Sequence, residues 1–171
     1  MVTGIITIAK GQRMAVKIVE TDIAFKKFFK NLKAFNGIEA AVGVPEEFAN
    51  EIVSDEGDFT RVAQATVHEF GSADGHIEER SFLRSTFNKN REKYQKDLEK
   101  AAAKVVRLDS TPLRELTVFS EKVRNDVVNR IRDGEITPEL AESTIDAKGS
   151  SLPLVDTGGL VGSIQARVLK K

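Results

Sequence analysis

The spacing of hydrophobic residues predicts a helix followed directly by a strand in the first third of the chain. Phenylalanine and leucine recur every three or four residues from Asp22 to Gly37, with lysines between them. This period, with an aspartate able to cap the helix and a glycine able to end it, predicts an amphipathic, Phe-rich helix. Residues 38–44 then alternate apolar with polar or small residues as far as Pro45, which indicates a half-buried strand.

Alternation near the two ends of the chain predicts further strands. Residues 5–19 alternate on either side of a Lys-Gly pair, which indicates two short strands around a turn. Residues 162–169 alternate in the same way, after a helical turn that Asp156 or Thr157 can cap. The strands of these regions and of residues 38–44 are expected to pair in one small, mainly antiparallel sheet.

The middle of the chain has helical spacing. A short helix is predicted to follow Thr60 and to end at Gly71, because threonine is a favoured helix cap and glycine a favoured terminator. A longer helix is predicted over residues 81–107, where apolar residues form one stripe. Asn88 and Asn90 are its weakest positions, since asparagine has a low helix propensity.

A second long helix is predicted from the pair Thr111 and Pro112 to Gly134, because threonine before proline is a common helix start. The connection between the two long helices is short, so they are expected to form an antiparallel hairpin over residues 81–133. A brief helix is predicted from Thr137 to about Ala147. The whole chain, residues 1–171, is thus expected to form a single α+β domain. It combines a small sheet packed by the Phe-rich helix with a long helical hairpin.

Composition excludes several classes of protein. The 171 residues include 26 basic and 26 acidic side chains and no cysteine. The balanced charge argues against general binding to nucleic-acid phosphates, and the lack of cysteine removes disulfides and thiolate metal ligands. The apolar run at residues 5–9 is too short to cross a bilayer and lacks the layout of a secretion signal. We therefore expect no cofactor, no specific nucleic-acid binding and no membrane anchor.

The neutral total conceals a separation of charge along the chain. Residues 1–37 carry seven basic and two acidic side chains, a net charge of +5, whereas residues 38–60 carry seven acids and no base, a net charge of −7. Both stretches can be ordinary solvated faces. Alternatively, the basic helix of one copy faces the acidic loop of the next, a contact between unlike surfaces that closes into a ring when the rotation allows it.

One group of residues invites a catalytic interpretation. His68, Glu69 and His76 carry imidazole and carboxylate groups that could bind zinc, which makes a small metal-dependent hydrolase the alternative function. The spacing does not fit the usual helical metal motif, because Ser72 stands where the second histidine of His-Glu-x-x-His is needed. No serine lies in a Gly-x-Ser-x-Gly nucleophile motif either, so we expect no enzymatic activity and no catalytic, cofactor or metal site.

Several short blocks of the chain form two groups. One group is Val42-Gly43-Val44, His68-Glu69-Phe70-Gly71 and Glu79-Arg80-Ser81-Phe82-Leu83-Arg84. The other is Thr144-Ile145, Lys148-Gly149-Ser150, Pro153-Leu154-Val155-Asp156-Thr157-Gly158 with Leu160, and Ser163-Ile164. Together these blocks resemble those of tail-completion and head-tail joining proteins of tailed phages. The blocks fall within residues 38–88 and 138–168, and the two long helices between them match no motif.

Two departures separate this chain from the better-known members of that family. Their Asp-Thr-Gly block precedes the other blocks, whereas here it closes the chain, so the motif order is permuted or the chain belongs to a separate branch. Ser81 replaces the usual proline, and Glu78 stands where proline is common, which leaves the start of the helix less rigid.

The resemblance implies a structural protein of the virion, located at the head-tail junction and assembled in the host cytoplasm. Members of the family commonly form rings, such as hexamers, and contact tail-tube, tail-terminator or head-connector proteins. We therefore expect a homo-oligomer. The side chains expected at assembly interfaces are Lys26, Lys30, Lys33, Glu46, Glu47, Glu51, Asp55, Glu56, His68, Arg80, Arg84 and Asp156.

Overall fold

The computed structural model describes residues 23–54, 59–139, 154 and 158–170. Within these residues the chain forms six α-helices, one 3-10 turn and a two-stranded antiparallel sheet, which confirms the predicted α+β class. In chain order the elements are α1 (Ile23–Phe35), β1 (Ile38–Gly43), η1 (Glu46–Phe48), α2 (Arg61–Phe70), α3 (Phe82–Lys89), α4 (Arg91–Val106), α5 (Pro112–Arg132), α7 (Gly159–Ser163) and β2 (Gln165–Lys170).

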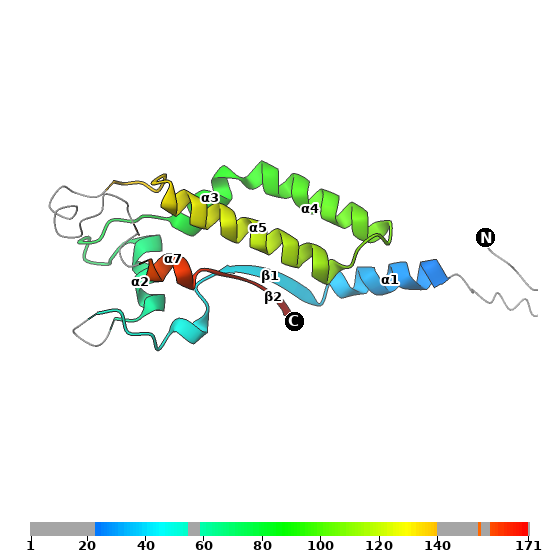
Figure 1. The fold of residues 1–171 in the computed structure, drawn as a ribbon, viewed down its shortest axis with the longest axis horizontal. Helices are drawn as coiled ribbons and strands as arrows, with labels where there is room; N and C mark the ends of the chain where they lie inside the picture. The colour runs from blue at the N-terminus through cyan, green and yellow to red at the C-terminus, as the bar shows by residue number, and fades with distance from the viewer. Residues whose placement is uncertain (1–22, 55–58, 140–153, 155–157, 171) are drawn as a thin grey trace, which may run out of the picture.

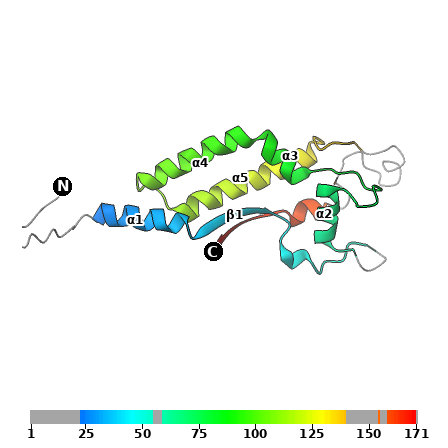
Figure 2. The same ribbon diagram turned by 180° about the vertical axis from the view of Figure 1, so that it is seen from behind.

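The described elements form an elongated body. Helices α4 and α5 lie side by side as the predicted hairpin, and the sheet runs along α5 (Figures 1 and 2). Helices α2, α3 and α7 gather at one end of the sheet, whereas α1 leads away from the other end, past the tip of the hairpin (Figure 1). None of the described helices is both long and apolar enough to span a membrane.

The sheet pairs β1 with β2 along six residues, from Ile38 opposite Lys170 to Gly43 opposite Gln165. Two of the predicted strand regions, 38–44 and 162–169, are thereby confirmed as antiparallel partners. Strand β2 begins only at Gln165, because residues 159–163 form helix α7. The predicted strands at residues 5–19 lie outside the described residues.

Helix α5 covers the sheet and packs on both strands. The Phe-rich helix, α1, was expected in that place, but it contacts mainly the ends of α4 and α5. Val123 and Val127 of α5 are buried, whereas Phe29 and Leu32 of α1 are 44% and 38% exposed. The longer apolar face of α5 therefore takes the position above the sheet, since it buries more apolar surface there.

Asn90 interrupts the long helix that was predicted over residues 81–107. Helix α3 ends at Lys89 and α4 begins at Arg91, and Asn90 between them has φ −102° and ψ 9°. Its side-chain amide donates a hydrogen bond to the carbonyl oxygen of Thr86 at 3.0 Å. An asparagine that bonds its own backbone neighbourhood competes with the helix, so the single helix predicted here is wrong and two helices meet at this residue.

The short helix and the start of the second long helix match their predictions. Thr60 caps α2 by accepting a hydrogen bond from the N–H of Ala63 at 3.2 Å, and Gly71 follows its last residue. Thr111 caps α5 in the same way, with Pro112 as the first helical residue. The brief helix predicted from Thr137 to Ala147 falls largely on residues 140–147, which lie outside the described residues.

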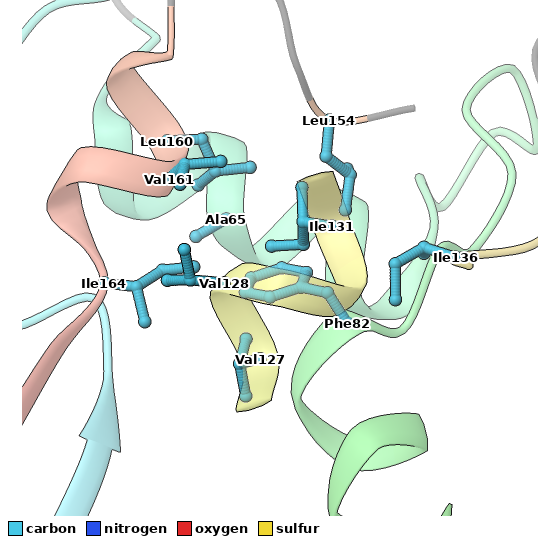
Figure 3. Packing of buried hydrophobic residues seen from close by; sticks show 10 residues of the cluster. All are labelled: Ala65, Phe82, Val127, Val128, Ile131, Ile136, Leu154, Leu160, Val161 and Ile164. Atoms are coloured by element: carbon cyan, nitrogen blue, oxygen red, sulfur yellow. The ribbon is translucent and has the colours of Figure 1, made fainter. Parts of the chain in front are cut away.

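The main hydrophobic core lies where α2, α3, α5 and α7 meet, at one end of the hairpin (Figure 3). Phe82 at the start of α3 and Ile131 near the end of α5 are both fully buried there. The cluster also takes in residues outside the helices. Its members are Ala65, Phe82, Val127, Val128, Ile131, Ile136, Leu154, Leu160, Val161 and Ile164.

Polar contacts join the two helices of the hairpin. Lys93 of α4 forms an ion pair with Asp126 of α5 at 2.9 Å, and Asp97 pairs with Lys122 one turn further along. The hydroxyl of the buried Tyr94 donates to the same Asp126 at 3.0 Å. Since the pair between Asp97 and Lys122 needs an ionised carboxylate, the stability of the hairpin depends on pH.

We expect the protein to lose stability in acid. The hydrogen bond from Lys122 holds the pKa of Asp97 below its ordinary value, and the one from Lys89 does the same for Glu135. A carboxyl group with a lowered pKa in the folded state stabilises the fold above its unfolded pKa of about 4, and this contribution is lost as the pH falls further. The thermal midpoint should therefore hold steady from pH 7 to about pH 5 and then fall towards pH 3.

Calorimetry across this pH range provides the measurement, and Asp97→Asn provides the control. The variant should have a lower thermal midpoint at pH 7 and a shallower decline in acid, because one of the titrating groups is gone. An acid decline of unchanged steepness would contradict the role of Asp97.

Candidate functional site

A buried carboxylate joins the two central motif blocks. Glu69, in the last turn of α2, is only 4% exposed. Its carboxylate accepts hydrogen bonds from the Ser81 hydroxyl at 2.7 Å and from the backbone N–H groups of Leu83 at 2.9 Å and Arg84 at 3.0 Å. The first N–H groups of a helix have no partner within it and carry partial positive charge, which favours an anionic acceptor. Glu69 therefore caps α3 from a different helix.

The guanidinium of Arg84 closes this arrangement from the solvent side. Its Nε donates to Glu69 Oε1 at 3.0 Å, and its Nη2 donates to the Glu69 carbonyl oxygen at 2.7 Å and to Glu79 Oε1 at 2.9 Å. The guanidinium carbon also lies 4.5 Å from the centre of the Phe70 ring, a cation–π contact. Arg84 thus balances the buried charge of Glu69 while half of its own side chain stays exposed.

A tight loop brings Ser81 back to Glu69. Gly71 has φ +79°, and a Cβ atom there would lie 3.2 Å from the carbonyl oxygen of Ile77, so glycine fits this turn best. The N–H of Ser72 donates to the same carbonyl oxygen at 2.9 Å. Further on, the N–H of Arg80 donates to the carbonyl oxygen of His68 at 2.7 Å. The loop between the two motif blocks is therefore closed by hydrogen bonds at both ends.

Arg80 connects the same region to the segment after α5. It is 8% exposed, and its guanidinium donates to the carbonyl oxygens of Pro138 at 3.0 Å and Glu139 at 3.1 Å. It also forms an ion pair with Glu78 at 3.3 Å. A buried guanidinium needs such partners, because an unpaired charge away from water is costly. Arg80 consequently belongs to the interior of the fold and offers little surface to a partner.

The C-terminal motif block contributes to the core. Leu160 and Ile164 are buried in the main cluster, and the buried Ser163 hydroxyl donates to the carbonyl oxygen of Leu160 at 2.8 Å. Arg61 of α2 lies so close to Gly159 that a Cβ atom there would be 2.4 Å from its Nη2. The motif residues of this block that the structure describes therefore serve packing.

The described residues do not assemble the alternative metal site. No group of three or more histidine, cysteine, aspartate or glutamate side chains within the described ranges could hold a metal ion. The Glu69 carboxylate already accepts four hydrogen bonds, one each from Ser81 and Leu83 and two from Arg84. The His76 side chain is 84% exposed and lies beside Asp74, on the loop after α2. Within the described ranges, His68, Glu69 and His76 therefore do not form a shared metal site.

The charged residues expected at interfaces occupy separate places. Lys26, Lys30 and Lys33 are exposed along α1, and Glu46 is exposed in η1. Two other expected acids have partners within this chain. Glu47 pairs with Arg167 of β2, whose hydrogen bond lowers the pKa of Glu47, and Glu51 pairs with Arg61 at 2.6 Å. Outside the described residues lie Asp55, Glu56 and Asp156.

The other three expected interface residues cluster around the Glu69 cap. His68 is half-buried in α2, Arg80 is buried, and Arg84 is half-exposed but bound to Glu69 and Glu79. The basic helix and the acidic stretch therefore remain candidates for contact with a partner, whereas this cluster stabilises the fold.

An apolar groove beside β1 is a surface that the sequence did not indicate. We call it the β1 groove; its volume is about 440 Å³. No single-helix or single-strand pattern could have predicted it, because three elements distant in sequence contribute to it. Its apolar lining includes Ala40 and Val42 of β1, Leu83 and Phe87 of α3, and Phe119 and Val123 of α5.

Comparison with known protein families, with curated proteins and with solved structures finds no match to this chain.

Proposed function

We propose that this chain is a structural protein of a tailed-phage virion that completes the tail or joins head to tail through ring-like self-assembly. Its contacts would be with further copies of itself and with tail-tube, tail-terminator or head-connector proteins. In this role the protein works through its shape and surfaces and catalyses no reaction.

The main observation in support of the proposal is that the polar motif side chains bind other groups of the same chain. Glu69, Arg80 and Arg84 are the polar side chains of the central blocks that could most readily perform chemistry. All three are bound to helix ends, backbone carbonyls or each other. Blocks that resemble a morphogenesis family thus hold a scaffold together, which is the use expected in an architectural protein.

Helix α1 supports the proposal as a surface for a partner. It projects from the body (Figure 1) and carries the half-exposed Phe29 and Leu32 beside the exposed Lys26, Lys30 and Lys33. An apolar stripe flanked by lysines suits a partner surface that is apolar at its centre and acidic at its rim. The acidic stretch around η1 of a second copy has the required charge.

Reversing the charge of α1 should weaken self-association. We expect the triple variant Lys26→Glu, Lys30→Glu and Lys33→Glu to raise the dissociation constant by about tenfold or more, because each reversal replaces attraction by repulsion at an interface rim. Light scattering or native mass spectrometry over a range of protein concentrations measures this. The unaltered assembly should also weaken as the salt concentration rises.

The matched control reverses three exposed basic residues elsewhere, Lys96→Glu, Lys100→Glu and Arg107→Glu, and should change the association little. The biological test is disruption of the gene in its phage, with free heads and unjoined tails as the expected products in electron micrographs. Normal particles from the disrupted phage would refute the proposed function.

A further inference from the structure

Among the described residues, strand β1 has a strand partner on one side only. It pairs with β2 along its whole length on that side, and we call its other side the open edge. The edge of a strand presents backbone N–H and C=O groups that another extended chain can pair with. The edge of β1 is therefore a place where a third strand could be added.

The sequence of β1 does nothing to protect this edge. Proteins commonly shield edge strands with lysine, proline or charged residues, yet β1 has a single charged residue, Glu39, and otherwise contains only aliphatic residues and glycine. Strand β2, at the opposite edge of the sheet, carries Arg167 and Lys170. The β2 edge is therefore better suited to solvent, and the β1 edge is better suited to pairing with another strand.

The β1 groove lies against the face of β1 that α3 and α5 cover. From the sheet it is lined by Ala40 and Val42 of β1 and by no residue of β2, so within the sheet it borders β1 alone. The groove wall opposite the sheet is formed by α3 and α5, with Phe87 and Phe119 among its residues. A chain paired with β1 would thus place every second side chain in an apolar groove.

We propose that residues 14–18 of a second copy of this chain add to the open edge of β1 as a third strand, with Met14, Val16 and Ile18 in the β1 groove. This inference rests on the proposed self-association and names the surface that carries it. In residues 14–18 the three apolar side chains alternate with Ala15 and Lys17, which is the period that strand addition requires.

The short connection between residues 14–18 and α1 assigns the added strand to a second copy. Helix α1 has 13 residues, so its start lies about 20 Å from its end, and β1 continues beyond that end (Figure 1). Ile18 precedes the start of α1 by five residues, which span at most about 17 Å. This connection is too short for residues 14–18 to reach past α1 and lie along Ala40 and Val42 of their own chain. The groove of a neighbouring copy is not subject to this limit.

Exchange of this kind also produces a directional contact. The strand that is donated and the groove that receives it are different surfaces of one molecule, so each copy can receive from one neighbour and donate to another. Such head-to-tail contacts close into a ring when the rotation between copies permits it. The open edge of β1 would then be covered in every copy of the ring.

Disulfide cross-linking tests the proposal directly, since the chain has no cysteine of its own. Side chains opposite each other on neighbouring strands are close enough for a disulfide. We expect Val16→Cys protein mixed with Ala40→Cys protein to form covalent dimers that contain one chain of each kind. Met14→Cys and Ile18→Cys are tested in the same way, against Ala40→Cys and Val42→Cys, to find the register.

The matched control is Lys17→Cys, whose side chain would point to the opposite face of the sheet and should cross-link with Ala40→Cys far less. A Val16→Cys, Ala40→Cys double variant that forms the disulfide within one chain would overturn the assignment to a second copy. Equal cross-linking by Lys17→Cys and Val16→Cys would overturn the strand geometry.

A second variant separates this inference from the proposed function. Val16→Asp with Ile18→Asp would bury carboxyl groups in the apolar groove and should weaken self-association by about a hundredfold or more. If the unaltered protein self-associates but the variant does so equally well and no cysteine pair cross-links, the strand exchange is wrong and the proposed function stands. If the unaltered protein remains a single chain at every concentration, both fail.

Discussion

Replacing Glu69 with alanine is expected to lower the free energy of unfolding by about 2–4 kcal/mol. The substitution removes the acceptor for the N–H groups of Leu83 and Arg84 and for the Ser81 hydroxyl. It also leaves the Arg84 guanidinium without its buried counter-charge. Donors that lose a buried partner cost more than the net value of the bonds they made.

The isosteric variant Glu69→Gln separates the charge from the shape of this side chain. A glutamine keeps one oxygen acceptor of similar position but replaces the other oxygen with an amide that donates. Its loss of stability should fall between those of the unaltered protein and Glu69→Ala. Urea unfolding followed by circular dichroism gives the three free energies, provided that the slopes against urea concentration agree.

The control for Glu69 is Glu79→Gln, which removes the other carboxylate that Arg84 contacts. The side chain of Glu79 is 53% exposed, so its loss should cost about 0.5 kcal/mol or less. A similar cost for Glu69→Ala and Glu79→Gln would show that the cap on α3 is not a principal support of the fold.

The sequence predicted those helix ends that depend on neighbouring residues. Thr60 and Gly71 bound α2 and Thr111 begins α5, because a hydroxyl cap or a glycine in the left-handed region acts on its own turn. The division at Asn90 was foreseen only as a weak point. Local propensity indicates that a helix is weakened there, whereas the hydrogen bond to Thr86 decides that it ends.

The position of the core could not be derived from periodicity alone. Ile136 and Leu154 are buried although neither belongs to a described helix or strand, and their burial depends on how α5 and α7 meet. The Phe-rich pattern gave the bounds of α1 correctly but not its place. An amphipathic stripe shows that one face of a helix prefers a partner, without showing which surface provides it.

The sequence identified the important residues of the candidate site but did not predict what they contact. The sequence singled out Glu69, Arg80 and Arg84, and the structure brings Glu69 and Arg84 together around the start of α3. Arg80 and Arg84 were expected at an interface, and Glu69 was expected only in the alternative metal site. The observed partners of all three lie within the chain. A cap supplied by another helix has no signature in the spacing of residues, because a loop of variable length separates the two helices.

Phe82 belongs both to the Glu79–Arg84 motif block and to the hydrophobic core, and its substitution has the largest expected effect on stability. It lies directly after Ser81, at the first position of α3, and its side chain is fully buried between α5 and the segments around it (Figure 3). The Glu69 cap fixes the direction in which α3 begins, and that direction aims Phe82 at the core. The packing of Phe82 therefore depends on Glu69, although Glu69 acts through hydrogen bonds and Phe82 through apolar contacts.

Replacing Phe82 with alanine should lower the free energy of unfolding by about 3–5 kcal/mol, since the loss of a buried ring combines lost transfer energy with the cost of a cavity. Because single domains are stable by only about 5–15 kcal/mol, part of the variant should unfold at moderate urea concentrations that leave the unaltered protein folded. Phe87→Ala is the control from the same helix. Its ring is 48% exposed, so its loss should cost about 1 kcal/mol. Equal losses for the two variants would refute the placement of Phe82 at the centre of the core, whereas the expected difference would tie the motif to the packing of α3 against α5.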